Sequence, residues 1–294
     1  MYEKYFNFAS KPFAMNPDPD FLYPSSQHAK ALTMLEYAIE SQAPFCLLTG
    51  DIGSGKTTLL RHFLRNLGGG VTVGLISNTH GQFRSIRPWA LSALGIASKG
   101  DSDIAQYEAL MEFFVREYSQ KRRTLLVVDE AHNLTPSILE ELRLLSNVNS
   151  ERDLSLQVLL MGQPELRTKL ERPELEQFAQ RVSVDFHLGP LPLQDASAYV
   201  RHRLTVAGGD PLLFDAEAIA FVHKRAGGIP RLINQLCDLA LVYAFAEQRR
   251  TINVQLLKQV LRDRKASGAI QLFGGRSDSQ PNMSPAARLS SERG

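Results

Sequence analysis

The sequence has little of what disulfide scaffolds, membrane spans and nucleic-acid-coating proteins require. Among 294 residues, the two cysteines, Cys46 and Cys237, cannot form a disulfide framework, which indicates a reducing compartment. The 33 basic and 31 acidic side chains leave a formal charge of +2, so a strongly basic nucleic-acid binder is not expected. The longest apolar run, residues 239–246, falls far short of the ~18 residues of a membrane span. With no signal-peptide pattern at the N-terminus, we expect a cytoplasmic protein without a membrane span of its own.

Up to residue 190, short apolar runs alternate with amphipathic stretches. Buried strands are predicted at residues 45–49, 71–77, 124–129, 156–162 and 182–188. Helical periodicity is found at residues 28–39, 56–67, 89–93, 107–119, 137–147 and 174–178. Alternating strands and helices predict an α/β fold, a parallel sheet with helices on both faces.

The strand pattern ends at Pro190. Beyond it, four helices are predicted at residues 195–206, 215–225, 230–249 and 253–265. We therefore expect an aromatic, proline-rich arm over residues 1–27 that lies on the domain following it, an α/β core over 28–190, a small all-α lid over 191–266, and a disordered tail over 267–294.

A phosphate-binding loop is the strongest functional signal. Residues 50–57 match the pattern G-x-x-x-x-G-K-[ST] and lie between a predicted strand and a predicted helix. Glycines let the backbone amides and the helix N-terminus face a phosphate, while Lys56 reaches the β- and γ-phosphates and Thr57 completes a Mg²⁺ shell. The predicted nucleotide-binding residues are Gly50, Asp51, Ile52, Gly53, Ser54, Gly55, Lys56, Thr57 and Thr58.

Two acidic residues end the predicted strand at 124–129. Asp129 is placed to hold a Mg²⁺-bound water, and Glu130 to polarise the water that attacks the γ-phosphate. The acidic pair therefore predicts hydrolysis of ATP with Mg²⁺ rather than binding alone. His132 is interpreted as a capping or packing residue. Asn78 is either a partner that restrains Glu130 or a satisfied amide at a strand end.

Three further residues are candidates for sensing the γ-phosphate. Gln163 follows the fourth predicted strand and is expected to contact the γ-phosphate or the attacking water. Arg231, in the first turn of a lid helix, would couple the nucleotide state to the position of the lid. Arg181, just before the fifth strand, is the candidate arginine finger for a neighbouring subunit, with Arg152, Arg167 and Arg172 as rivals.

The order of these motifs along the chain, from the phosphate loop through the acidic pair to Gln163, Arg181 and Arg231, resembles that of the AAA+ ATPases. More narrowly, residues 1–6, 11–13, 16–28, 160–166 and 228–234 are similar to the ExeA/GspA-type secretion ATPases. That resemblance implies a P-loop core with a helical lid and an ATPase that assists assembly of a secretion, pilus or polysaccharide-export machine at the inner membrane. Family members with a membrane segment and a peptidoglycan-binding module are matched only in their ATPase part. The chain looks more like the shorter members associated with pilus, exopolysaccharide and exosortase gene sets.

We therefore expect a Mg²⁺-dependent ATPase that forms homo-oligomers, drives or licenses assembly of such an export machine, and meets the inner membrane through a partner. One alternative is a DNA-binding ATPase of the transposition-regulator type, because the ATPase core is also similar to those proteins. Its basic clusters would be residues 121–123, 249–250 and 262–265, although these are more simply solvated helix ends. A second alternative is a nucleotide-gated scaffold with little turnover, against which Glu130 argues.

Overall fold

The computed structural model describes residues 1–16, 18–77, 79, 84–97, 100, 102–148, 156–268 and 273. Asn78 and most of the predicted tail lie outside the described residues. In the described part of the chain, no helix is long and apolar enough to cross a membrane.

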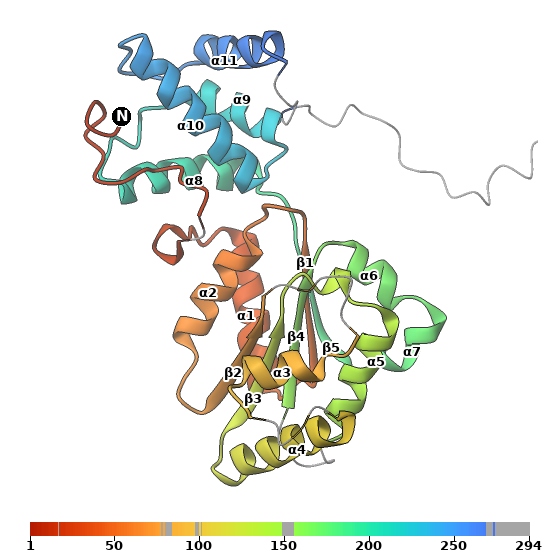
Figure 1. Ribbon diagram of the computed structural model, residues 1–294. Coiled ribbons are helices and arrows are strands. Elements are labelled where there is room, and N and C mark those ends of the chain that lie inside the picture. The colour runs from red at the N-terminus through yellow and green to blue at the C-terminus, as the bar shows by residue number, and fades with distance from the viewer. Residues whose placement is uncertain are drawn as a thin grey trace, which may run out of the picture.

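Five parallel strands form one sheet in the order β2-β3-β4-β1-β5 (Figure 1). Their bounds are β1 Phe45–Gly50, β2 Val71–Ile76, β3 Arg123–Val128, β4 Leu156–Gly162 and β5 Val182–Leu188. All five predicted strands are confirmed, and so is the predicted α/β fold. The order places β4 between β1 and β3, so the carboxyl ends of these three strands meet at one edge.

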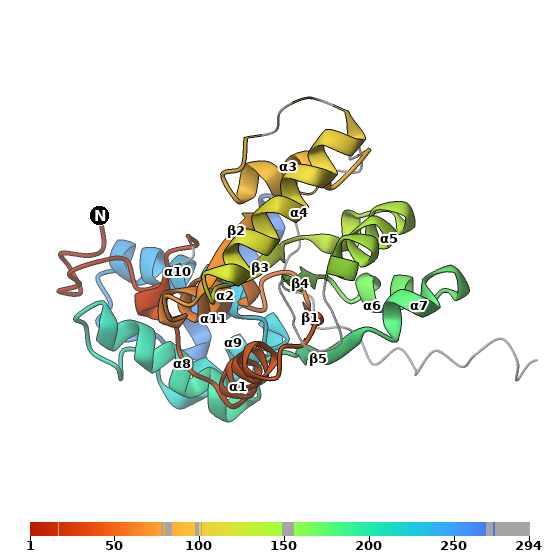
Figure 2. The same ribbon diagram turned by 90° about the horizontal axis from the view of Figure 1, so that it is seen from below.

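Helices cover both faces of the sheet, as predicted (Figure 2). Helices α1 (Ser26–Glu40) and α2 (Lys56–Asn66) pack on one face. The other face is covered by α3 Arg87–Ala93, α4 Asp103–Ser119, α5 Pro136–Leu145, α6 Glu165–Leu170 and α7 Glu176–Ala179. Because successive side chains of a strand point to opposite faces, Leu47 joins one cluster while Leu48 joins the other.

Four helices form a separate cluster above the sheet, which we call the lid: α8 Leu193–Val206, α9 Ala216–Ala226, α10 Pro230–Ala246 and α11 Val254–Ala266. Asp215 and Asn253 cap α9 and α11 by accepting hydrogen bonds from backbone amides. Among the short helices, α6 was not predicted, and the helix predicted at residues 174–178 is a 3₁₀ turn followed by α7.

The N-terminal arm was expected on the α/β core, and this prediction is wrong for its first thirteen residues. The aromatic side chains of this segment are buried in the cluster of the lid. Figure 1 shows the red N-terminal segment running beside the lid helices. Phe8 lies against Gly209, where a Cβ atom would come within 2.0 Å of the ring. The arm's aromatic side chains therefore enlarge the core that the four lid helices form. The residues concerned are Tyr2, Phe6, Phe8 and Phe13.

Candidate functional site

The phosphate loop (residues 50–57) joins β1 to α2 at the carboxyl edge of the sheet. Gly53 and Gly55 have φ angles of 81° and 102°, in the left-handed region that favours glycine. The Lys56 ammonium group is folded back onto the loop, where it donates hydrogen bonds to the carbonyl oxygens of Gly50 (2.7 Å) and Asp51 (3.1 Å). Lys56 is only 8% exposed. The loop therefore holds a cation at its centre.

The chemistry of this loop fits a phosphate group. Burial lowers the pKa of Lys56, while the charges of Glu130 and Asp129 oppose that shift. The Ser54 hydroxyl is buried with no hydrogen-bond partner. A phosphate group would place a negative charge in direct contact with the buried lysine and supply an acceptor for the Ser54 hydroxyl.

Thr57 and Asp129 adjoin one another and fit a Mg²⁺ ion. The Thr57 hydroxyl is hydrogen-bonded to the Asp129 carboxylate, whose pKa is raised by burial and lowered in part by hydrogen bonds from Thr57 and from the Glu130 backbone. Among the described residues, no group of three or more His, Cys, Asp and Glu side chains could hold a metal ion. Mg²⁺ in nucleotide enzymes takes most of its ligands from phosphate oxygens and water, so a site with one carboxylate and one hydroxyl fits this ion.

Glu130 occupies an unusual backbone conformation directly after β3. Its φ and ψ angles are 53° and 33°, which cost a non-glycine residue of order 1–2 kcal/mol. Two hydrogen bonds to the Glu130 carbonyl hold it there, one from the Thr79 hydroxyl (2.6 Å) and one from the Asn133 backbone amide (3.0 Å). The Asn133 side chain in turn donates to the Thr79 carbonyl (3.0 Å). The carboxylate itself is about half exposed and lines the site cavity.

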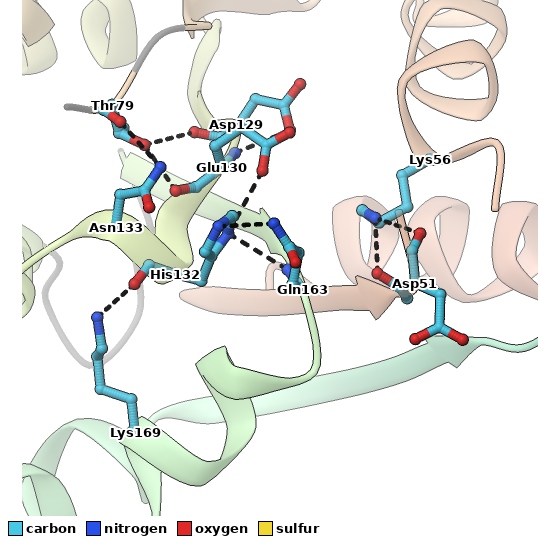
Figure 3. A network of polar contacts seen from close by, with 10 residues as sticks. Asp51, Lys56, Thr79, Asp129, Glu130, His132, Asn133, Gln163 and Lys169 are labelled. Atoms are coloured by element: carbon cyan, nitrogen blue, oxygen red, sulfur yellow. Dashed lines mark hydrogen bonds and ion pairs between the residues drawn. The ribbon is translucent and has the colours of Figure 1, made fainter. Parts of the chain in front are cut away.

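Gln163 follows β4 and therefore lies between the strand of Asp129 and the strand of the phosphate loop. Its side-chain amide is 2.9 Å from Nε2 of His132, and Nδ1 of the same ring is 3.4 Å from the Glu130 carboxylate. Figure 3 shows both Gln163 and Glu130 turned toward the His132 ring. The imidazole thus does more than pack, because it links two of the predicted site residues.

Arg231 brings the lid against the phosphate loop. Its backbone amide donates a 3.2 Å hydrogen bond to the Gly53 carbonyl, and a Cβ atom on Gly53 would lie 2.4 Å from the Arg231 Cβ. Only glycine permits this approach. The Arg231 side chain is exposed and lines the same cavity as Lys56 and Glu130.

The cavity between the lid and the core measures about 390 Å³, within the range of small-molecule sites. Its walls include six of the nine predicted nucleotide-binding residues, together with Glu130, Gln163 and Arg231. The remaining wall comes from the second half of the arm, from the first turn of α1 and from the lid. It includes Met15, Phe21, Tyr23, His28, Tyr199, Arg203 and Asn234. A larger, more open hollow of about 620 Å³ lies outside α8 and α9 and contains none of the predicted site residues.

His28 is a site residue that the sequence reasoning missed. Its ring is 5% exposed and contacts Ser25 Oγ at 2.7 Å, while its Nε2 faces the phosphate loop so closely that a Cβ on Gly55 would be 2.8 Å away. A polar side chain on the inner face of α1, in register with Ala31 and Leu35, is the signal that pointed to it. Thr79 was also passed over in favour of its neighbour Asn78.

Arg181 lies away from this cavity. Val182 pairs with Phe45, the first residue of β1, so Arg181 is at the amino edge of the sheet, opposite the phosphate loop. Its guanidinium donates hydrogen bonds to the Arg143 carbonyl (3.2 Å) and Ser146 Oγ (2.8 Å) at the end of α5.

A phosphate loop on β1, an acidic pair after β3, a polar residue after β4 between them, and an arginine on a helical lid define a AAA+ protein of the P-loop type. In agreement, residues 39–170 match the model of a AAA domain family. The chain is also 38% identical over 247 residues to the general secretion pathway protein A of Aeromonas hydrophila, a match that covers 84% of this chain and 45% of that protein. It is thus an ExeA/GspA-like member of the AAA+ family, and it spans less than half the length of this curated relative.

Solved structures show the same fold at low sequence identity. The ORC2 protein of Aeropyrum pernix, solved as ADPNP–ADP complexes, aligns with a TM-score of 0.66 and 16% identity over 87% of this chain and 72% of that one. The Aeropyrum pernix ORC1 protein in complex with DNA aligns with a TM-score of 0.60 and 20% identity over 86% and 69% of the two chains. These similarities concern the fold alone.

Proposed function

We propose that this protein is a Mg²⁺-dependent ATPase that oligomerises and drives or licenses assembly of a bacterial secretion, pilus or exopolysaccharide-export machine. The observation that carries the proposal is the convergence of Lys56, Glu130, Gln163 and Arg231 on one cavity, with Asp129 and Thr57 paired beside it. No pair of these residues is specific on its own, but their meeting at one edge of the sheet is what phosphoryl transfer requires.

Each side chain has a part in hydrolysis that follows from its position. Lys56 exchanges the carbonyl oxygens of Gly50 and Asp51 for phosphate oxygens, to which its charge is better suited. Glu130 accepts a proton from the attacking water, and Gln163 orients the γ-phosphate or that water. Mg²⁺ bound by Thr57 and Asp129 would neutralise the charge of the phosphates.

The contact between Arg231 and the phosphate loop supports coupling between the nucleotide and the lid. Because the Arg231 backbone is bonded to Gly53, a γ-phosphate that attracts the guanidinium acts on the first turn of α10 directly. The lid would then change its angle with the nucleotide state, and that movement would act on the assembly partner.

The proposal includes an oligomer in which Arg181 of one subunit acts as the arginine finger in the nucleotide site of its neighbour. Arg181 would have to leave its bonds to the end of α5, whereas Arg172 is 55% exposed and has only a 3.7 Å ion pair with Glu174. Mixing Arg181→Ala with Lys56→Ala tests the assignment, because a mixed oligomer contains one composite intact site. If both single variants are inactive and the mixture stays inactive while Arg172→Ala mixtures recover, Arg172 takes the role.

The proposed export role and a place at the inner membrane through a partner rest on the similarity to general secretion pathway protein A. Contacts within the chain argue against a basic DNA-binding stripe. Arg122 is paired with Glu117 at 2.7 Å, Arg249 with Glu247 at 2.8 Å, and the Arg250 guanidinium stacks on Tyr5 at 3.9 Å. These cations already have partners in this chain.

The experiment that tests the proposal is ATP turnover of the purified protein across protein concentration and salt, with and without duplex DNA. We expect turnover that needs Mg²⁺, rises with protein concentration and ignores DNA, and that Glu130→Gln abolishes while nucleotide binding persists. Strong stimulation by DNA that collapses with salt would move the function to the DNA-binding alternative. Binding without turnover in the wild type would leave the nucleotide-gated scaffold.

A further inference from the structure

The ring of His132 is held rigidly at the end of β4. A Cβ atom on Gly162 would lie 3.1 Å from the His132 backbone nitrogen and 3.4 Å from Nδ1. The His132 ring therefore packs closely against the backbone at position 162, where a larger side chain would crowd it. The Lys169 ammonium group donates hydrogen bonds to the carbonyls of His132 and Leu134 and fixes the turn from below. With 15% of its side chain exposed, His132 has little freedom to move.

Both nitrogens of this fixed ring face residues with proposed roles in hydrolysis. Nε2 lies 2.9 Å from the Gln163 side-chain amide. Nδ1 lies 3.4 Å from the Glu130 carboxylate and 3.4 Å from the Gln163 backbone nitrogen (Figure 3). The Glu130 carboxylate is much more exposed than the ring, at 47%, and the other contacts of this residue are made by its backbone.

We propose that His132 is a positioning residue for ATP hydrolysis, which keeps the carboxylate of Glu130 beside Nδ1 and the amide of Gln163 on Nε2, so that both address the same γ-phosphate together. The inference rests on the proposed function of the site. It gives His132 no proton transfer and no contact with the nucleotide. The Gln163 amide carries two N–H groups, so it can keep one on the ring while it presents the other to a phosphate.

This role affects the chemical step and leaves nucleotide binding almost unchanged. ATP is held by the phosphate loop and the cavity walls; His132 does not line this cavity and reaches it through Glu130 and Gln163. Loss of the ring nitrogens frees Glu130 and Gln163 to rotate independently, and misplacement of either group lowers the rate of attack by water. The effect therefore belongs in kcat, while KM for ATP stays constant.

The matched variants are His132→Phe, which keeps a ring against Gly162 but has no nitrogens, and His132→Gln, which keeps a polar group able to donate and accept. We expect kcat of His132→Phe to fall by about tenfold or more, with KM for ATP within about twofold of the wild type. His132→Gln should recover part of that loss. Thermal melting and titration with a fluorescent ATP analogue verify that each variant is folded and binds nucleotide.

A double-mutant cycle with Gln163→Ala gives the sharper result. If the two side chains act as one unit, His132→Phe/Gln163→Ala is no slower than the slower single variant, whereas independent roles multiply the two losses. Multiplied losses, a kcat of His132→Phe near the wild-type value, or an equal rise in KM overturn the proposal.

Glu130→Gln in the same series separates the two levels of inference. If Glu130→Gln abolishes turnover while His132→Phe has the wild-type rate, the role of His132 is refuted and the proposed ATPase function is retained. Equal rates in the wild type and Glu130→Gln refute the proposed function, and the role of His132 with it.

Discussion

Acid should destabilise this protein through His28. The imidazole is buried between Ser25 and the phosphate loop, and burial lowers its pKa from the ordinary 6.5 to about 4, although a hydrogen bond with the Ser54 backbone and the charge of Asp195 act in the opposite direction. Between pH 6.5 and about 4, the His28 imidazole is therefore protonated in the unfolded chain and neutral in the folded chain. The stability that the neutral ring contributes is present above pH 6.5 and is lost as the pH falls through 4.

The magnitude follows from the two pKa values. A difference of roughly 2.5, at about 1.36 kcal/mol for each pKa unit, amounts to about 3 kcal/mol of unfolding free energy lost between pH 6.5 and 4. The perturbation is His28→Gln, whose amide can still donate to the Ser54 carbonyl but does not titrate. Urea unfolding at a series of pH values should show a flatter pH dependence for this variant than for the wild type, by about this amount.

An identical pH dependence in the wild type and His28→Gln would refute the reasoning. Proton NMR of the His28 imidazole provides an independent measurement, and a pKa near 6.5 would contradict the burial argument directly.

Three further predictions concern the site. Thr79→Val removes the hydroxyl that holds the Glu130 carbonyl and should cost about 1–3 kcal/mol of stability together with ATP turnover, whereas Thr79→Ser should retain both; equal losses in the two variants would contradict this. Gly53→Ala places a Cβ 2.4 Å from that of Arg231 at a φ of 81°, so fluorescence titration should show a nucleotide affinity about tenfold weaker or worse, while Gly189→Ala, with open space around it, should bind normally. Asp129→Asn removes a buried carboxylate whose pKa is raised, so the nucleotide-free variant should have a higher melting temperature than the wild type at neutral pH. The gain should shrink as the pH falls through the raised pKa, and Mg²⁺-dependent turnover should be lost. A lower melting temperature at neutral pH would refute the burial argument.

Much of the nucleotide site was predictable because its parts are local in the sequence. A phosphate loop binds through consecutive backbone amides and needs glycine at particular places, so residues 50–57 carry the signal by themselves. The strands were recognised for a similar reason. Strands buried on both faces are continuous apolar runs, and β4 is buried along its whole length. Helix α6, with only six residues, is too short to show a periodicity and was missed.

The remaining features depend on contacts between distant residues, which no periodicity reports. The strand order places Gln163 between β1 and β3, and only that order makes it a neighbour of both Lys56 and Glu130. The side chain of His132 was interpreted as packing because its two partners come together only after β4 has paired with β3.

The sequence by itself determined the phosphate loop, the acidic pair, the five strands and the helical composition of the lid, since each depends on residues within a few positions of one another. The tertiary structure alone decided where the arm packs, that His132 lies beside the Glu130 carboxylate, and that the Arg231 backbone is hydrogen-bonded to Gly53. The physical reason is that apolar burial is non-directional: an aromatic arm is equally suited to either domain by composition, and only its contacts with the core of the lid in the folded protein select one of them.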